Sequence, residues 1–171
     1  GDIDAYHSPK LKEKMEEQKE VLRQAGYTLK ELSIEKIDLA VQAYYPIVYT
    51  EFYSGTRKFD GLKYGQQIEE VGGPEVLRRV LGGREISKSE FDGAYYKKAL
   101  KVKEIIEGSF EEAFSTVDAI ITPVVPALPQ HFGEVTEPKD AYSFDAFTIP
   151  ANLGGLCSGV LPTSTIEDGN E

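Results

Sequence analysis

The sequence is poor in the residues that mark several large protein classes. Its 171 residues contain one cysteine, Cys157, which excludes an internal disulfide framework and favours a reducing compartment. The two histidines, His7 and His131, argue against a histidine metal site. No apolar run approaches the roughly 18 residues of a membrane-spanning helix, and the first ten residues form no secretory signal. We therefore expect a cytoplasmic protein that binds no metal and contacts no membrane.

Positive charge is also scarce. The chain has 29 acidic and 19 basic residues, a net charge of −10 and a pI near 4.8. Independent binding to a phosphate backbone requires clustered lysine and arginine, so this balance argues against it. The hydrophobic content of 40% is that of a globular protein able to bury a core. Because the chain begins at Gly1 without an initiator methionine, we expect it to be a piece of a longer protein.

The clearest periodic pattern covers residues 87–117. Apolar or aromatic residues recur at three-or-four spacing, which places them on one face of a helix. They are Phe91, Tyr95, Ala99, Val102, Ile106, Phe110, Ala113 and Val117. Ser87 and Glu90 have the spacing of a capping box, so the helix is expected to begin there. It would be a long buried helix that crosses a larger body.

Three further helices are predicted. One begins at Ser8-Pro9 and stops at Gly26, with leucines and Met15 forming a buried stripe. Another covers residues 37–52, where Pro46 is expected to kink or break it. A short helix covers residues 75–81, and Gly82-Gly83 is expected to close it.

Two apolar segments predict strands between these helices. Residues 27–34 follow the first helix, and residues 119–122 follow the long one and run into Pro123. Helices alternating with strands predict an α/β fold. The whole chain, residues 1–171, is expected to belong to a single domain.

A few residues are candidates for binding, each with an ordinary structural alternative. Tyr44, beside Pro46, either lines a pocket or is half-buried packing. Arg78 and Arg79 leave their helix about 100° apart, so one is expected to face water. The other either clamps a carboxylate or forms an exposed ion pair. Asp145, between two phenylalanines, requires a cavity or a cationic partner, because burying an unpaired carboxylate is costly.

The glycines near the end of the chain carry no recognisable site. Gly154, Gly155 and Gly159 do not have the spacing of a dinucleotide or phosphate loop. Cys157-Ser158 lacks the Gly-x-Ser-x-Gly nucleophile elbow and has no apparent base. A turn of small residues is the better interpretation.

Three blocks of sequence resemble the C-terminal half of the amidase signature family, and most closely the A subunits of its glutamine-dependent aminoacyl-tRNA amidotransferases. The first block is YYPIVYTEFYSGTRKFDGLKYG, residues 44–65. The second combines GPEVLRRVLGG with FDGAYYKKALKVKEII, and the third combines VDAIITPVVP with FDAFTIPANLGGL. Their order and approximate spacing agree with the family across nearly the whole chain. The resemblance implies the family's fold, a mixed β-sheet flanked by helices, of which only the C-terminal part would be present here.

The resemblance implies a role in glutamine recognition. Arg79 would bind the α-carboxylate of glutamine, Asp145 its α-ammonium group, and Tyr44 would line the pocket. The family's serine nucleophile, second serine and lysine lie in a signature region that nothing here matches, so no catalytic residue is assigned. Partner subunits B and C would complete the enzyme, with ATP and magnesium held by a partner subunit that also holds most of the tRNA.

Two other functions stay open at this point. The chain could belong to a stand-alone amidase of the same family that acts on another small amide. It could also be a structural or interaction fragment that lacks the catalytic half. An amino-acid preference supplied by Arg79 and Asp145 distinguishes the amidotransferase from the first alternative.

Overall fold

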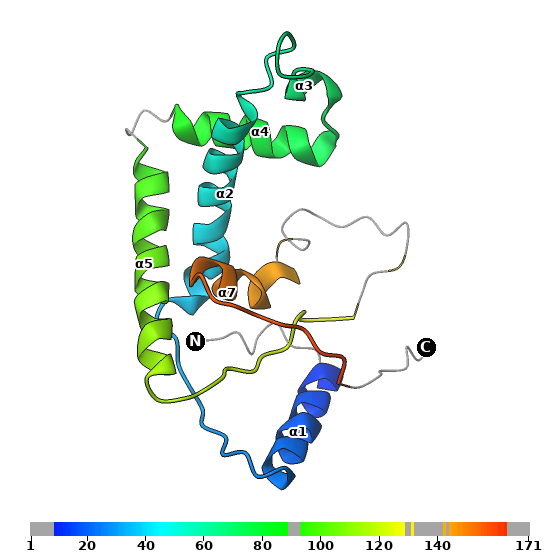
Figure 1. Ribbon diagram of the computed structural model, residues 1–171, viewed down its shortest axis with the longest axis vertical. Coiled ribbons are helices and arrows are strands. Elements are labelled where there is room, and N and C mark those ends of the chain that lie inside the picture. The colour runs from blue at the N-terminus through cyan, green and yellow to red at the C-terminus, as the bar shows by residue number, and fades with distance from the viewer. Residues whose placement is uncertain (1–8, 89–92, 129–130, 132–141, 143, 164–171) are drawn as a thin grey trace. The chain divides into compact units, whose positions relative to one another are not determined.

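The computed structural model describes residues 9–88, 93–128, 131, 142 and 144–163 (Figure 1). Contacts divide the chain into two compact units, Gly1–Val41 with Ile106–Glu171, and Gln42–Ile105. The helices, in chain order, are α1 (Pro9–Gln24), η2 (Ile37–Leu39), α2 (Ala40–Thr56), α3 (Ile68–Val71), α4 (Pro74–Ser87), α5 (Ala94–Phe114), η3 (Phe144–Phe147) and α7 (Ile149–Leu153).

The two predicted strands are absent from this part of the chain. Residues 27–34 and 119–122 are both described, and neither has regular secondary structure. A strand is stable only when a neighbouring strand satisfies its backbone groups, and no such neighbour lies among the described residues. The predicted mixed β-sheet is therefore not found here, and Ile121 remains 51% exposed.

Helix α1 ends as the sequence predicts. Gly26 adopts a φ of +91°, a conformation that favours glycine. Its N–H donates to the carbonyl of Arg23 at 3.0 Å, and the Tyr27 N–H donates to that of Leu22 at 3.0 Å. These two bonds form a Schellman motif, which satisfies carbonyls left open at the helix end. The predicted N-cap, Ser8, lies outside the described residues.

The predicted buried stripe of α1 is wrong, because the helix contains no fully buried residue. Ion pairs along its own surface support it instead. Lys14 Nζ lies 2.8 Å from Glu17 Oε2, Lys19 pairs with Glu16, and Arg23 with Glu20. Each pair spans three positions, so the contacts are local to the helix.

Of the kink or break predicted at Pro46, the break is wrong, because helix α2 continues through the proline. Proline removes one backbone hydrogen bond and crowds the preceding turn. The buried residues Ala40, Ala43 and Ile47 lie on either side of it at helical spacing. Burial of this face offsets the local cost of the proline.

Helix α4 also continues past its predicted end, through Gly82 and Gly83 to Ser87. These glycines do not end α4. They allow α2 to approach it closely. A Cβ placed on Gly83 would lie 2.6 Å from the Tyr53 Cβ and 2.7 Å from the Tyr49 backbone carbon. One on Gly82 would lie 2.6 Å from the Tyr49 ring. Only glycine fits this crossing of α2 and α4.

Helix α5 is confirmed, but it is shorter than predicted. It begins at Ala94, and Ser87 instead ends α4, where its Oγ donates to the Gly83 carbonyl at 2.7 Å. The proposed capping box is therefore wrong at Ser87, and Glu90 lies outside the described residues. Four of the predicted core residues are buried: Ala99, Ile106, Phe110 and Ala113. Tyr95, by contrast, is 56% exposed.

The first unit has its core around the C-terminal part of α5 and the short helices η3 and α7. Phe147, Ile149 and Leu153 are buried, and η3 contacts α7. Gly154 lies close to α5, since a Cβ there would be 2.9 Å from the Phe110 ring. On α5, Ser109 Oγ accepts a hydrogen bond from the Glu35 N–H at 2.9 Å.

Candidate substrate-binding site

Two of the three predicted site residues, Tyr44 and Arg79, lie in the second unit. Gly73 precedes the first residue of α4, and Pro74 occupies the first turn, where its missing N–H leaves no bond unmade. Glu75 follows in that turn, where a negative charge interacts favourably with the helix dipole. Arg79 lies one turn later. The local sequence thus sets an acid and a base on adjacent turns.

Glu75 binds both arginines of the pair. Its Oε2 accepts from Arg78 Nη1 at 2.7 Å, and its Oε1 accepts from Arg79 Nε at 3.1 Å. Spacings of three and four residues place all three side chains on neighbouring parts of the helix surface. The side chain of Arg79 is 36% exposed and that of Arg78 is 47% exposed. Of the two, Arg79 is therefore the more enclosed.

The surroundings of Arg79 favour its charged form. Burial acts to lower its pKa, but the hydrogen bond and charge of Glu75 act in the opposite direction. Tyr49 and Tyr45 add to the effect of Glu75, and the net result is a pKa raised above its usual value. The guanidinium group therefore remains positive, as recognition of an anion requires.

The tyrosines of α2 form a row of edge-on rings. Tyr44 and Tyr45 have ring centroids 5.4 Å apart at 84°, and Tyr45 and Tyr49 are 5.8 Å apart at 75°. This T-shaped geometry is favourable for aromatic pairs. Tyr44 packs against Tyr45, and Tyr45 contributes to the electrostatic environment of Arg79. The row of ring contacts thus extends from Tyr44 to Tyr49.

The third predicted residue, Asp145, lies in η3 of the first unit. It is partly buried, beside the buried residues Ala146 and Phe147. Its backbone carbonyl accepts from the N–H of Thr148 at 3.1 Å and from its Oγ1 at 3.2 Å. These bonds hold the backbone of η3. A shared cavity for Arg79 and Asp145 stays a prediction.

Sequence reasoning overlooked Glu75, although the signal was available. The segment Glu75-Val76-Leu77-Arg78-Arg79 places an acid three and four residues before two bases, a spacing typical of helix ion pairs.

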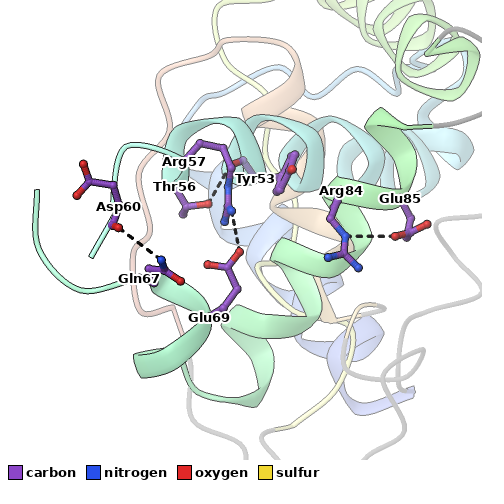
Figure 2. A network of polar contacts seen from close by, with 8 residues as sticks. All are labelled: Tyr53, Thr56, Arg57, Asp60, Gln67, Glu69, Arg84 and Glu85. Atoms are coloured by element: carbon purple, nitrogen blue, oxygen red, sulfur yellow. Dashed lines mark hydrogen bonds and ion pairs between the residues drawn. The ribbon is translucent and has the colours of Figure 1, made fainter. Parts of the chain in front are cut away.

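A second polar network braces the loop after α2 (Figure 2). Arg57 Nη1 lies 2.7 Å from Glu69 Oε1, and the Arg57 Nε donates to the Tyr53 carbonyl at 3.3 Å. The guanidinium group also lies over the Tyr53 ring, 4.6 Å from its centroid. The hydrogen bond from Arg57 lowers the pKa of Glu69 against the effect of burial. One arginine thus ties α2 to α3.

Asp60 fixes the turn within this loop. Its Oδ1 accepts from the backbone N–H groups of Leu62, Lys63 and Tyr64 at 2.9, 3.0 and 3.2 Å. These bonds lower the pKa of Asp60, because they favour the ionised carboxylate. Gly61 has a φ of +75°, as an Asp-Gly turn requires. Asp-Gly is a typical turn sequence, and residues 60–64 form the turn that it favours.

The described residues contain no group of three or more histidine, cysteine, aspartate or glutamate side chains that could hold a metal ion. Cys157 is exposed. No helix in the described part of the chain is sufficiently long and apolar to cross a membrane.

Comparisons with known proteins cover nearly the whole chain. The family model described as amidase matches residues 2–170. The A subunit of the glutamyl-tRNA(Gln) amidotransferase of Methanocaldococcus jannaschii is 45% identical over 92% of this chain and 36% of its own length. The protein of the same name in Methanococcus maripaludis is 44% identical over 92% of this chain and 37% of its own length. The one in Methanosphaera stadtmanae is 46% identical over 84% of this chain and 30% of its own length. The chain thus spans about a third of the length of these curated relatives.

Proposed function

Because this chain belongs to the amidase family, we propose that it forms part of the glutamine-hydrolysing subunit of a tRNA-dependent amidotransferase. The observation that carries the proposal is the 45% identity, over 92% of the chain, to a protein named as the A subunit of such an enzyme. In the proposed reaction, the subunit releases ammonia from glutamine. Partner subunits B and C then use it, with ATP and magnesium, to amidate glutamate or aspartate on a mischarged tRNA.

The chain's part in this reaction is to hold glutamine. Arg79 binds the α-carboxylate, because a planar guanidinium matches a planar carboxylate through two parallel hydrogen bonds. Asp145 binds the α-ammonium group, and Tyr44 lines the pocket. Two opposed charge contacts fix the orientation of the amino acid and thereby place its side-chain amide for attack. The enclosed position of Arg79 and its raised pKa are compatible with this role.

The attacking serine and its lysine are assigned to a part of the protein outside this chain. We place the partners of the two apolar segments, residues 27–34 and 119–122, in the same part. There they would add strands to a mixed sheet, and the exposed Ile121 would be covered. The isolated chain is accordingly expected to show no glutaminase activity.

Steady-state glutaminase kinetics of the complete subunit test the proposal. Arg79→Ala removes charge-assisted hydrogen bonds worth about 1.5–3 kcal/mol, so the KM for glutamine should rise roughly 10- to 100-fold. Asp145→Asn should raise it by a similar factor. Arg84→Ala is the matched control, since Arg84 lies on the same helix and pairs with Glu85.

The outcomes distinguish the proposed function from the alternatives. An unchanged KM in both Arg79→Ala and Asp145→Asn would refute the glutamine pocket. If the same protein hydrolysed simple amides without an α-carboxylate equally well, it would be a stand-alone amidase. Glutaminase turnover by the isolated chain would show that the nucleophile had been placed wrongly.

A further inference from the structure

Glu75 holds Arg79 by one edge of its guanidinium group. Among the hydrogen bonds of the described residues, Arg79 uses only Nε, which donates to Glu75 Oε1 at 3.1 Å. One N–H of each terminal nitrogen points outward at the end of the planar group, away from the Nε–H that Glu75 accepts. These two N–H groups form the end of the fork that a second carboxylate would bind. The ion pair with Glu75 therefore leaves the substrate-binding end of Arg79 open.

From this geometry we infer that Glu75 is a positioning residue for substrate recognition. The inference rests on the proposed function, in which Arg79 binds the α-carboxylate of glutamine. An arginine side chain is flexible, and bidentate binding requires its plane to be fixed. Glu75 fixes that plane in advance, so less conformational freedom is lost when glutamine binds.

The second arginine makes this arrangement more specific. Because Arg78 Nη1 binds Glu75 Oε2 at 2.7 Å, both carboxylate oxygens of Glu75 are engaged. Rotation of the Glu75 carboxylate would break one of the two bonds. Arg78 thereby holds Glu75 in the orientation in which Oε1 faces Arg79. The role of Arg78 is thus to orient the residue that orients Arg79.

The negative charge of Glu75 reduces the positive charge of the two arginines but does not cancel it. One carboxylate between two guanidinium groups leaves the cluster with a net charge of +1, which still attracts a carboxylate substrate. From α2, Tyr49 and Tyr45 add to the effect of Glu75 in raising the pKa of Arg79. The side chain of Arg79 is 36% exposed, so solvent weakens the pairing without removing it.

The test compares glutamine with glutamine α-methyl ester, which lacks the free carboxylate, in the complete amidase subunit with its partner subunits. Glu75→Ala should raise the KM for glutamine about threefold to fivefold, the upper range for a partly exposed ion pair, and leave kcat within about twofold. The kinetics with the ester should stay unchanged. Glu75→Gln keeps an oxygen that accepts from Arg79 Nε. The increase in log KM for glutamine that it causes should be about half of the increase caused by Glu75→Ala.

Glu85→Ala is the matched control, because Glu85 pairs with Arg84 at 3.3 Å on the same helix and should leave both substrates unaffected. An unchanged or lowered KM for glutamine in Glu75→Ala would overturn the inference. Equal losses for glutamine and its ester would also overturn it, since they would indicate a merely structural role. If Arg79→Ala raises the KM while Glu75→Ala does not, only this inference fails. If neither substitution raises the KM for glutamine, the role of Arg79 in the proposed function fails as well.

Discussion

Replacing Gly83 with alanine tests the close crossing of α2 and α4. The new Cβ would lie 2.6 Å from the Tyr53 Cβ and 2.7 Å from the Tyr49 backbone carbon. Ordinary carbon–carbon contacts are about 3.5–4.0 Å, so the two helices would have to separate by about 1 Å. Backbone atoms form part of this contact, so a rotamer change cannot relieve it.

The expected cost follows from two opposed effects. Overpacking a well-filled contact costs about 1–3 kcal/mol. Replacing glycine with alanine inside a helix raises the free energy of unfolding by about 1 kcal/mol, through helix propensity. The net loss in the free energy of unfolding should therefore be about 0–2 kcal/mol, and the contact with backbone atoms favours the upper half of this range. With a urea m-value of about 2 kcal/mol/M, a loss of about 1–2 kcal/mol lowers the midpoint of unfolding by roughly 0.5–1 M.

Gly108→Ala is the control for this measurement. Gly108 lies inside α5, and a Cβ there meets nothing within 4 Å. The substitution should raise the free energy of unfolding by about 0.5–1 kcal/mol through helix propensity alone. If Gly83→Ala raised the urea midpoint as Gly108→Ala does, the close approach of α4 to α2 would be refuted.

Two further substitutions test single features of the second unit. Pro46→Ala should raise the free energy of unfolding by about 1–3 kcal/mol, because it restores a hydrogen bond inside α2; an unchanged urea midpoint would contradict this. Asp60→Asn should lower the thermal midpoint at pH 7. Since the folded pKa of Asp60 is lowered, its stabilisation is complete above its ordinary pKa and is lost as the pH falls through the folded value. The difference in thermal midpoint between wild type and variant should narrow from pH 7 to pH 3. A constant difference would show that the ionised carboxylate of Asp60 does not stabilise the turn.

The approximate positions of α1, α2, α4 and α5, and the end of α1, could be predicted from the sequence. The stop of α1 at Gly26 depends on glycine's freedom to adopt positive φ, which is a local property. The buried face of α5 follows from spacing alone, and Ile106 and Phe110 are buried as expected. Asp60 and Gly61 likewise predict their turn without knowledge of the rest of the chain.

The errors arose where distant parts of the chain decide the outcome. Gly82-Gly83 was interpreted as a helix stop, but the glycines accommodate α2, which no local pattern reveals. Pro46 was expected to break a helix that burial maintains. Residues 27–34 and 119–122 have the composition of strands, but a strand depends on neighbours that the pattern cannot supply.

For the candidate site, residue types were predictable and their partners were not. The sequence predicts Arg79 and Tyr44 as binding candidates. The structure places Glu75 beside Arg79 and Tyr45 beside Tyr44. The spacing of Glu75 was sufficient to find the first. The effect of Tyr45 on the pKa of Arg79 depends on the packing of α2 and α4, which no local pattern reveals.

The absence of fully buried residues in α1 has a consequence for hydrogen exchange. Its ion pairs lie within the helix, so opening it sacrifices few contacts with the rest of the chain. Its amides should therefore exchange through local opening, well before those of Ile106 or Phe110 in α5. Because surface pairs are screened by salt, higher ionic strength should accelerate exchange in α1 and leave the α5 core nearly unaffected.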